Sequence, residues 1–344
     1  MAGTGTAHLH APDEALLRVE DLTMEFPVGR TGLKVHAVSG ISFDVLPGET
    51  LGLVGESGCG KSTTGKALIH LPPPTSGSVR FEQKELSGLR GESFRKLRTS
   101  IQMIFQDPIS SLNPRRTVRD IVAEPLHIWN VGNAETRREK VDEVLETVGI
   151  DPGSADRRPH QFSGGQCQRI SIARSLIIEP KLLICDEPVS ALDVSVQAQV
   201  LNLLEDLKAK YGLTMIFIAH DLAVVKNVSD RVCVMYLGKM CEVASSDDLY
   251  ARPAHPYTSR LLTSIPVPDP KVKPDPTLRI QGELPSPMTP PSGCRFRTRC
   301  PFAQEQCAAE EPKLRDIGGR HFVACHFPLV DAGSPSPSGN AANN

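Results

Sequence analysis

Short apolar runs recur along the chain and are separated by longer amphipathic stretches. The clearest runs are TLGLV at 50–54, KLLIC at 181–185 and LTMIFIA at 213–219. Runs of this length that are rich in Leu, Ile and Val are typical of buried strands. None approaches the roughly 18 consecutive apolar residues that a membrane-spanning helix needs. We therefore expect buried strands and no membrane span.

Other segments have the periodicity of helices or of hairpins. The stretch 194–212 is amphipathic and ends at a glycine, as helices commonly do. Residues 23–47 are typical of antiparallel strands with turns, and VMYLGKMCEV at 234–243 is typical of a hairpin. The segment 136–150 places four apolar side chains on one helical face, namely Val141, Val144, Leu145 and Val148. Alternation of strand and helix predicts an α/β fold built on a mostly parallel sheet.

Length and charge limit what the chain can be. A chain of 344 residues suggests about two domains, and 40% apolar residues allow a sizeable core. The net charge of −2 provides no basic field for a nucleic acid partner. The N-terminus has neither the basic start nor the apolar core of a signal peptide, so we expect a cytoplasmic location.

A glycine-rich segment directly follows the first apolar run. GESGCGKST at 55–63 matches the pattern G-x-x-x-x-G-K-S, and the helix-compatible TGKALIH comes next. Glycines let backbone N–H groups turn inward around a phosphate, and the helix N-terminus adds the positive end of its dipole. We expect Lys61 to reach the β- and γ-phosphates and Ser62 to contact Mg²⁺. The predicted phosphate loop consists of Gly55, Glu56, Ser57, Gly58, Cys59, Gly60, Lys61, Ser62 and Thr63.

An acidic pair ends the second apolar run. Asp186 and Glu187 belong to KLLICDEP at 181–188. Asp186 can hold Mg²⁺ through water at the end of a strand beside the phosphate loop, and Glu187 is then placed to polarise an attacking water. An acidic pair after a strand is more often a solvated loop. The phosphate loop over a hundred residues upstream favours the functional interpretation.

Between these two sites lies HQFSGGQCQRISIARSL at 160–176, in which SGGQ precedes a helical segment at 168–177. The exposed N–H groups before a helix can receive a phosphate. A second phosphate-receiving surface in a chain that already has a complete loop implies a partner's nucleotide. SGGQ in this place resembles the signature motif of ATP-binding-cassette (ABC) ATPases, and the resemblance covers about 16–243.

This resemblance implies roles for several more residues. Gln106 in QMIFQDP resembles the glutamine of the Q-loop, which would contact Mg²⁺ together with Ser62 and Asp186. SALD at 190–193 resembles the D-loop, His220 in FIAHDL resembles the switch histidine, and Phe26 would lie against adenine. In the family's head-to-tail dimer the second cassette's ATP would face Ser163, Gly164, Gly165 and Gln166. The implied catalytic residues are Glu187, His220 and Gln106.

Three segments narrow the resemblance to one subgroup of ABC ATPases. FQDPISSLNPRRTV at 105–118, HPYTSRLLTSIP at 255–266 and the cysteine-bearing tail resemble the ATPase subunits of oligopeptide/dipeptide permeases, a group that includes nickel uptake systems. The implied fold is a P-loop ABC ATPase with a RecA-like core, an antiparallel β subdomain and a cysteine-rich C-terminal extension. The expected parts are a disordered 1–14, a nucleotide-binding domain at 15–254 with a helical subdomain at about 94–161, an extension at 255–328, and a disordered tail at 329–344.

The resemblance also implies an activity and partners. The activity is ATP hydrolysis that powers import of di- or oligopeptides or related small solutes. The partners are a second ABC ATPase subunit, for which a paralogue is the better expectation, two transmembrane permease subunits and, indirectly, an extracytoplasmic solute-binding protein. The chain would then lie peripherally on the cytoplasmic face of the inner membrane. The alternatives are a nickel or other solute importer, a soluble non-transport ABC ATPase, and a metal-binding module whose nucleotide site is vestigial.

The cysteines form two groups. Five are scattered and are expected to pack as small apolar residues, namely Cys59, Cys167, Cys185, Cys233 and Cys241. Cys167 stands where ABC ATPases commonly have arginine or lysine. The other four lie in the tail, at Cys294, Cys300, Cys307 and Cys325.

The spacing of the tail cysteines, C-x5-C-x6-C-x17-C, lacks the close C-x-x-C pair of most zinc sites and matches no common ferredoxin pattern. Spacing alone therefore does not choose a metal, although clustered thiols in a Pro-rich segment argue for a metal site. The permease resemblance implies a [4Fe–4S] cluster on the four cysteines, with zinc as the lesser alternative and metal-free thiols as the third. Because every nucleotide motif precedes Asp221, we expect loss of such a metal to leave the ATP site intact.

Overall fold

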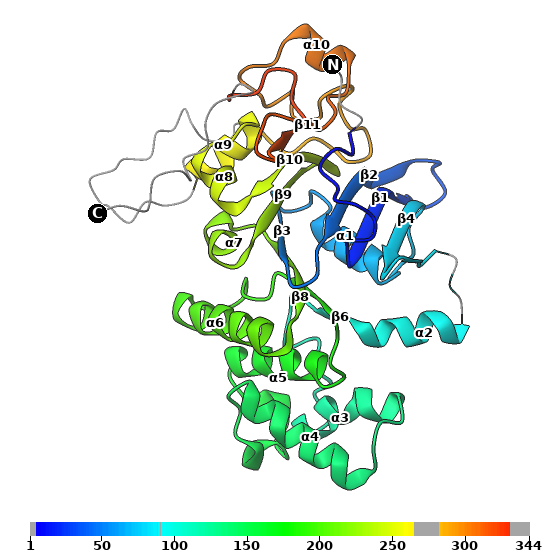
Figure 1. Cartoon of the computed structure of the whole chain (residues 1–344), viewed down its shortest axis with the longest axis vertical. Helices are drawn as coiled ribbons and strands as arrows, with labels where there is room; N and C mark the ends of the chain where they lie inside the picture. Colours follow the sequence, from blue (N-terminus) through cyan, green and yellow to red (C-terminus); the bar gives the residue numbers. More distant parts are fainter. Residues whose placement is uncertain (1–4, 88, 90, 265–281, 331–344) are drawn as a thin grey trace, which may run out of the picture. The chain divides into compact units, whose positions relative to one another are not determined.

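The computed structural model describes residues 5–87, 89, 91–264 and 282–330 (Figure 1). The chain divides into two compact units, of which one consists of 1–88 and 219–344 and the other of 89–218. Within the described part of the chain, no helix has the length and apolar character of a membrane span.

The first unit contains an antiparallel sheet. Strand β1 pairs with β2 along most of its length, and β4 lies on the other side of β1. Buried and half-buried positions alternate at the start of β1, as expected for a sheet with one face on the core. This sheet confirms the antiparallel prediction for 23–47. Its strands, in the order in which they pair, are β2 (Lys34–Val45), β1 (Leu17–Pro27), β4 (Ser76–Phe81) and β5 (Lys84–Glu85).

The same unit contains the strand that carries the glycine-rich loop. Strand β3 (Thr50–Val54) runs parallel to β9 (Arg231–Tyr236), and β9 forms the predicted hairpin with β10 (Lys239–Ser245). The C-terminal segment then adds two short strands, because β12 (Phe322–Val323) pairs with β10 and β11 (Arg315–Asp316) pairs with β12. The helices of this unit are α1 (Lys61–Leu68), α7 (Leu222–Val228), α8 (Ser246–Ala251), α9 (Pro256–Thr263) and α10 (Glu305–Ala309).

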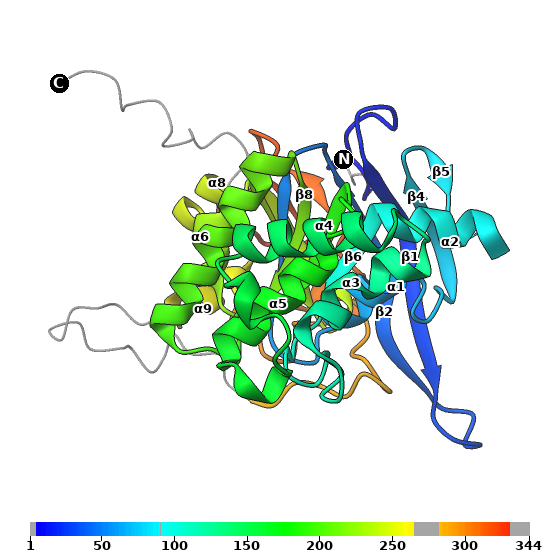
Figure 2. The same ribbon diagram turned by 90° about the horizontal axis from the view of Figure 1, so that it is seen from below.

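The second unit has three parallel strands, in the order β6 (Ile101–Ile104), β7 (Leu182–Asp186) and β8 (Thr214–Ala219). Helices α3, α4, α5 and α6 lie side by side in both views (Figures 1 and 2). The four predicted apolar positions of 136–150 are buried, and α6 ends at Gly212 as predicted. This glycine has the left-handed conformation that often ends a helix. The helical elements are α2 (Gly91–Ser100), α3 (Val118–Ile128), α4 (Ala134–Thr147), η1 (Pro152–Ser154), η2 (Pro159–Gln161), α5 (Gly164–Leu176) and α6 (Val194–Tyr211).

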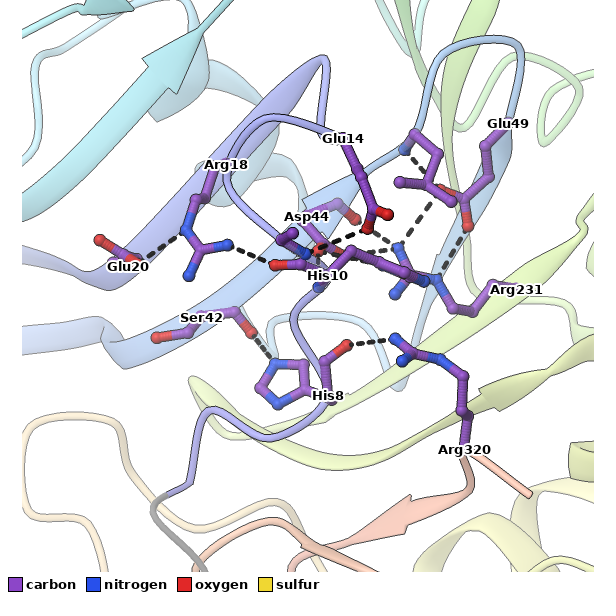
Figure 3. A network of polar contacts seen from close by, with 12 residues as sticks. His8, His10, Glu14, Arg18, Glu20, Ser42, Asp44, Glu49, Arg231 and Arg320 are labelled. Carbon is purple, nitrogen blue, oxygen red and sulfur yellow. Dashed lines mark hydrogen bonds and ion pairs between the residues drawn. The ribbon is translucent and has the colours of Figure 1, made fainter. Parts of the chain in front are cut away.

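The N-terminal segment corrects the expectation of disorder over 1–14, at least for residues 5–14. His8 is 1% exposed, and its ring nitrogen lies 2.7 Å from the carbonyl oxygen of Ser42 (Figure 3). His10 donates its backbone N–H to the carboxylate of Asp44, which Arg231 also pairs with at 2.8 Å. A buried carboxylate needs such donors. Contacts of His8 and His10 with β2 therefore hold the segment 5–14 against the first sheet. Of the predicted disordered tail at 329–344, residues 331–344 lie outside the described residues.

Candidate nucleotide-binding site

The glycine-rich loop lies between β3 and α1, in the strand–loop–helix order that the sequence predicts. Two of its glycines leave no room for a side chain. A Cβ on Gly55 would lie 2.1 Å from the carbonyl oxygen of Met235, and a Cβ on Gly60 would lie 2.2 Å from that of Ala37. Both have positive φ, of 152° and 105°. The backbone of the loop is thus held against neighbouring strands, and any larger residue would displace it.

Lys61 points into the loop. Its side-chain ammonium donates to the carbonyl oxygens of Gly55 at 2.7 Å and Glu56 at 3.0 Å, and the residue is 4% exposed. The first turn of α1 contains no acidic residue, so the positive end of the helix is not neutralised from within. This arrangement of a cation, a glycine-rich loop and a helix N-terminus can bind a chain of phosphates.

Three more predicted residues of this unit have distinct surroundings. Cys59 is fully buried, and burial raises the pKa of its thiol, so it packs as predicted. Phe26 is half-buried near the end of β1, opposite Val35 of β2. His220 is exposed and comes directly after β8.

The second unit brings two predicted catalytic residues into contact. Gln106 donates its side-chain amide to a carboxylate oxygen of Glu187 at 2.9 Å. Both follow the carboxyl ends of neighbouring parallel strands, β6 and β7, which meet at one edge of a sheet. Asp186, the last residue of β7, is 2% exposed. The sequence alone does not reveal the contact or the burial, because 81 positions separate Gln106 from Glu187.

Glu187 is held in an unusual backbone conformation. Its φ is 48°, in the left-handed region that residues with a side chain seldom adopt, and it is 8% exposed. Its N–H donates to the carbonyl oxygen of Ile218 at 2.9 Å, and its own carbonyl accepts from the hydroxyl of Ser190 at 3.1 Å. Strain of this kind persists where the surroundings fix it, often at functional sites. The backbone of Glu187 is thereby fixed directly after β7.

The SGGQ segment forms a helix cap. The Ser163 hydroxyl accepts from the N–H of Gln166 at 3.3 Å, and the Gln166 side chain accepts from the N–H of Ser163 at 2.9 Å. This reciprocal cap starts α5 at Gly164, four residues before the start that the sequence predicts. Cys167 is 1% exposed with its thiol 3.5 Å from the carbonyl of Pro159, so it packs as predicted.

Gly165 lies where the structure leaves no room for a side chain. A Cβ there would lie 2.4 Å from a methyl group of Val196 in α6, whereas a Cβ on Gly164 would meet nothing closer than 3.7 Å. We expect Gly165→Ala to lower the free energy of unfolding by about 1–2 kcal/mol, because overpacking outweighs the gain in helix propensity. Thermal unfolding checks this, with Gly164→Ala as the matched control. Equal unfolding midpoints for the two variants would contradict it.

The four tail cysteines meet at one small pocket. Cys294, Cys300, Cys307 and Cys325 all line it, together with His255 and Phe296. Burial, and to a smaller extent the three other thiols, raise the pKa of Cys325 to about 12. The expected compact metal site is not found, since no three or more His, Cys, Asp or Glu side chains of the described ranges are grouped so as to hold a metal ion. The five remaining cysteines are buried, as predicted.

Sequence reasoning missed two residues that touch the phosphate loop. Tyr257 and Arg299 both bond to Glu56, through its N–H and its carboxylate respectively. The resemblance of 255–266 to permease ATPases indicated that the segment containing Tyr257 matters, but it did not predict a contact with the phosphate loop. Arg299 carried no signal, because only the fold brings it near the loop.

The phosphate loop, the acidic pair after β7 and the capped SGGQ helix define an ATP-binding-cassette ATPase. A profile of the ABC transporter family matches residues 38–190, and one of the oligopeptide/dipeptide transporter C-terminal region matches 241–307. The chain is 51% identical to the oligopeptide transport ATP-binding protein AppF of Bacillus subtilis, over 92% of this chain and 98% of that protein. It is also 51% identical to OppF of Escherichia coli, over 91% and 96%. The chain therefore belongs to the family of oligopeptide transport ATP-binding proteins.

Solved structures confirm the ABC ATPase fold. The ATP-binding cassette MJ0796 bound to ADP and Pi gives a TM-score of 0.61 at 27% identity, over 67% of this chain and 98% of that one. CbiO1 of Clostridium perfringens, part of the ABC transporter complex CbiONQ, gives 0.61 at 32% identity, over 69% and 91%. Both confirm the fold predicted from the motifs.

Proposed function

We propose that this chain is the subunit that hydrolyses ATP to power import of di- or oligopeptides. The observation that carries the proposal is the complete catalytic set of an ABC ATPase in a chain about half identical to two oligopeptide transport ATP-binding proteins. The match to the oligopeptide/dipeptide C-terminal region supports peptide import over nickel import, and it supports a transport role over a non-transport one. The intact phosphate loop and acidic pair argue against a vestigial nucleotide site.

In this proposal the loop from Gly55 to Thr63 binds the phosphates of ATP, and Lys61 neutralises the β- and γ-phosphates. Glu187 accepts a hydrogen bond from the water that attacks the γ-phosphate, and Gln106 holds that carboxylate in place. Ser62, Asp186 and Gln106 would hold Mg²⁺, which supplies positive charge to the transferred phosphoryl group. His220 acts beside the γ-phosphate, and Phe26 lies against adenine.

The signature residues act on a second nucleotide. Ser163, Gly164, Gly165 and Gln166 would face ATP bound by another cassette, for which a paralogue is the better expectation. Support comes from the exposed position of Ser163 at the N-terminus of α5. Hydrolysis at the two sites would reopen the pair and move the membrane subunits.

We propose two transmembrane permease subunits and an extracytoplasmic solute-binding protein as the further partners, with this chain peripheral on the cytoplasmic face of the membrane. The second unit offers exposed apolar side chains for docking, at Ile109, Ile128 and Val131. Ile109 lies beside the turn Ser110–Arg116, in which Ser110 and Asn113–Arg116 are exposed and Leu112 is buried.

The experiment is to purify the chain from its native cells with a mild detergent and identify the proteins that accompany it. We expect two permease subunits and a second cassette, and ATP hydrolysis that rises when the peptide-loaded binding protein is added. Co-purification with ribosomes or nucleic acid, and no membrane subunit, would contradict the proposal.

We also propose that the tail cysteines hold a [4Fe–4S] cluster. Support comes from the four thiols that line one pocket, since a cubane needs four such ligands arranged around it. A cluster binds four separate irons, so its thiolates need not be close enough for a single ion. Zinc remains the lesser alternative. The cluster would cross-link the segment 294–325, where it would act as a structural staple.

Protein purified without oxygen should be brown and contain about four irons per chain. Cys300→Ser should remove the colour and the iron, because one of four ligands is lost. Cys233→Ser, at a buried cysteine of β9, is the control and should keep both. Iron analysis and visible absorption measure this. Stoichiometric zinc in place of iron, from iron-replete cells, would contradict the cluster.

A further inference from the structure

The segment between the first two tail cysteines makes a direct contact with the phosphate loop. The guanidinium of Arg299 pairs with the carboxylate of Glu56 in a two-pronged arrangement, at 2.6 Å and 3.1 Å. The Arg299 side chain is 7% exposed and that of Glu56 is 27% exposed. Glu56 is the second residue of the loop, so an arginine from the C-terminal segment is bonded to the nucleotide site itself.

The backbone of Glu56 is held from the same side. Its N–H donates to the hydroxyl of Tyr257 in α9 at 2.8 Å. Tyr257 is fully buried, and its ring packs against Tyr236 at 4.8 Å and Phe296 at 5.3 Å between centroids. Phe296, like Arg299, lies between Cys294 and Cys300. Both the peptide and the side chain of Glu56 are thus fixed by groups outside the loop.

The charge of Glu56 explains why such a contact matters. ATP brings several negative charges into the loop, and a carboxylate there repels them unless it is neutralised. A bidentate arginine cancels that charge and also fixes the direction in which the carboxylate points. A lysine would cancel the charge without the fixed geometry.

We propose that Arg299 is a positioning residue for the phosphate loop, and that through it the cysteine-bearing segment sets the affinity for ATP. Arg299 immediately precedes Cys300, and its N–H donates to the carbonyl of Phe296 at 2.9 Å. Disorder in 294–300 would therefore release Glu56. This reverses the expectation that loss of order in the tail leaves the ATP site intact. The proposal rests on the proposed binding of ATP by the loop. It does not depend on which group the cysteines hold.

The test is the equilibrium Kd of a fluorescent ATP analogue for the full chain. Arg299→Ala should raise the Kd about tenfold, because it leaves the Glu56 carboxylate unneutralised beside the phosphates. The ATPase rate at saturating ATP should change by less than about twofold, since Arg299 does not touch the reacting groups. The matched control is Lys239→Ala, which removes another ion pair to the C-terminal segment, with Glu311, away from the loop. Its Kd should equal that of the wild type.

A double variant shows whether Arg299 acts by positioning Glu56 or only by stabilising the fold. On a Glu56→Gln background the carboxylate is gone, so adding Arg299→Ala should change the Kd by less than about twofold. Arg299→Gln, which keeps most of the side-chain volume, replaces Arg299→Ala if the latter does not fold and should raise the Kd at least threefold. A wild-type Kd for the folded Arg299 variant would overturn the proposal. An equal rise in Kd from Arg299→Ala in the wild type and in Glu56→Gln would overturn it as well.

Discussion

Glu187→Gln is expected to keep ATP binding and to lower turnover by about 10²–10⁴-fold. The amide has the size of the carboxylate, so the contact with Gln106 can be kept while the ability to accept a proton is lost. The left-handed backbone of Glu187 is unchanged by this substitution. Phosphate release under saturating ATP measures turnover, and equilibrium binding of ATP shows that the site is still formed. If the proposed second cassette also hydrolyses ATP, that cassette must carry the corresponding change.

The matched control for this prediction is Glu179→Gln. Glu179 belongs to the same unit and also has positive φ, of 54°, but its exposed side chain pairs with Lys140. Surface ion pairs of this kind contribute little to stability. Turnover should therefore be unchanged in the control. If Glu187→Gln also kept near-normal turnover, Glu187 could not be the residue that activates the water.

Lys61→Ala is expected to weaken ATP binding by the isolated subunit roughly 10–100-fold, because it removes charge-assisted hydrogen bonds to the phosphates. Lys61 is nearly buried, and its ammonium already lies inside the loop on the carbonyls of Gly55 and Glu56. The measurement is equilibrium binding to the purified chain. Lys66→Ala, at an exposed lysine of the same helix, is the control and should bind ATP normally.

Ser163→Ala separates the two phosphate-binding surfaces. In the proposed cassette pair, the phosphate that Ser163 faces belongs to the partner's ATP. The substitution should therefore leave ATP binding by the isolated subunit unchanged and impair closure of the pair. The loss of the cap costs about 1 kcal/mol of helix stability, so unfolding must be measured alongside. Binding weakened in the isolated subunit as much as by Lys61→Ala would show that the signature acts on its own chain's nucleotide.

Local patterns in the sequence predicted the elements that carry the site. The strand at 50–54, the loop after it and the strand that ends at Asp186 are all short segments whose structure is set by neighbours within a few residues. Helix α6 likewise begins and ends at the residues that its periodicity and its terminal glycine predict. The start of α5 was missed because the capping contact between Ser163 and Gln166 extends the helix toward the signature.

Contacts between distant segments could not be predicted. Asp44 is buried at the end of β2, and its need for donors orders the polar N-terminal segment, which composition alone assigned to disorder. Arg299 and Glu56 are separated by 243 positions, and neither belongs to a motif that names the other. Long-range pairs of charged groups leave no periodicity in a single sequence, so only the fold shows them.

The most direct test is uptake of a labelled oligopeptide by proteoliposomes that contain the chain, the proposed second cassette and the two proposed permease subunits. With the binding protein outside and ATP inside, we predict uptake that requires ATP and that stops when Glu187→Gln is introduced together with the matching change in the second cassette. ATP hydrolysis without peptide uptake, while a nickel complex or another small solute is taken up, would contradict peptide import.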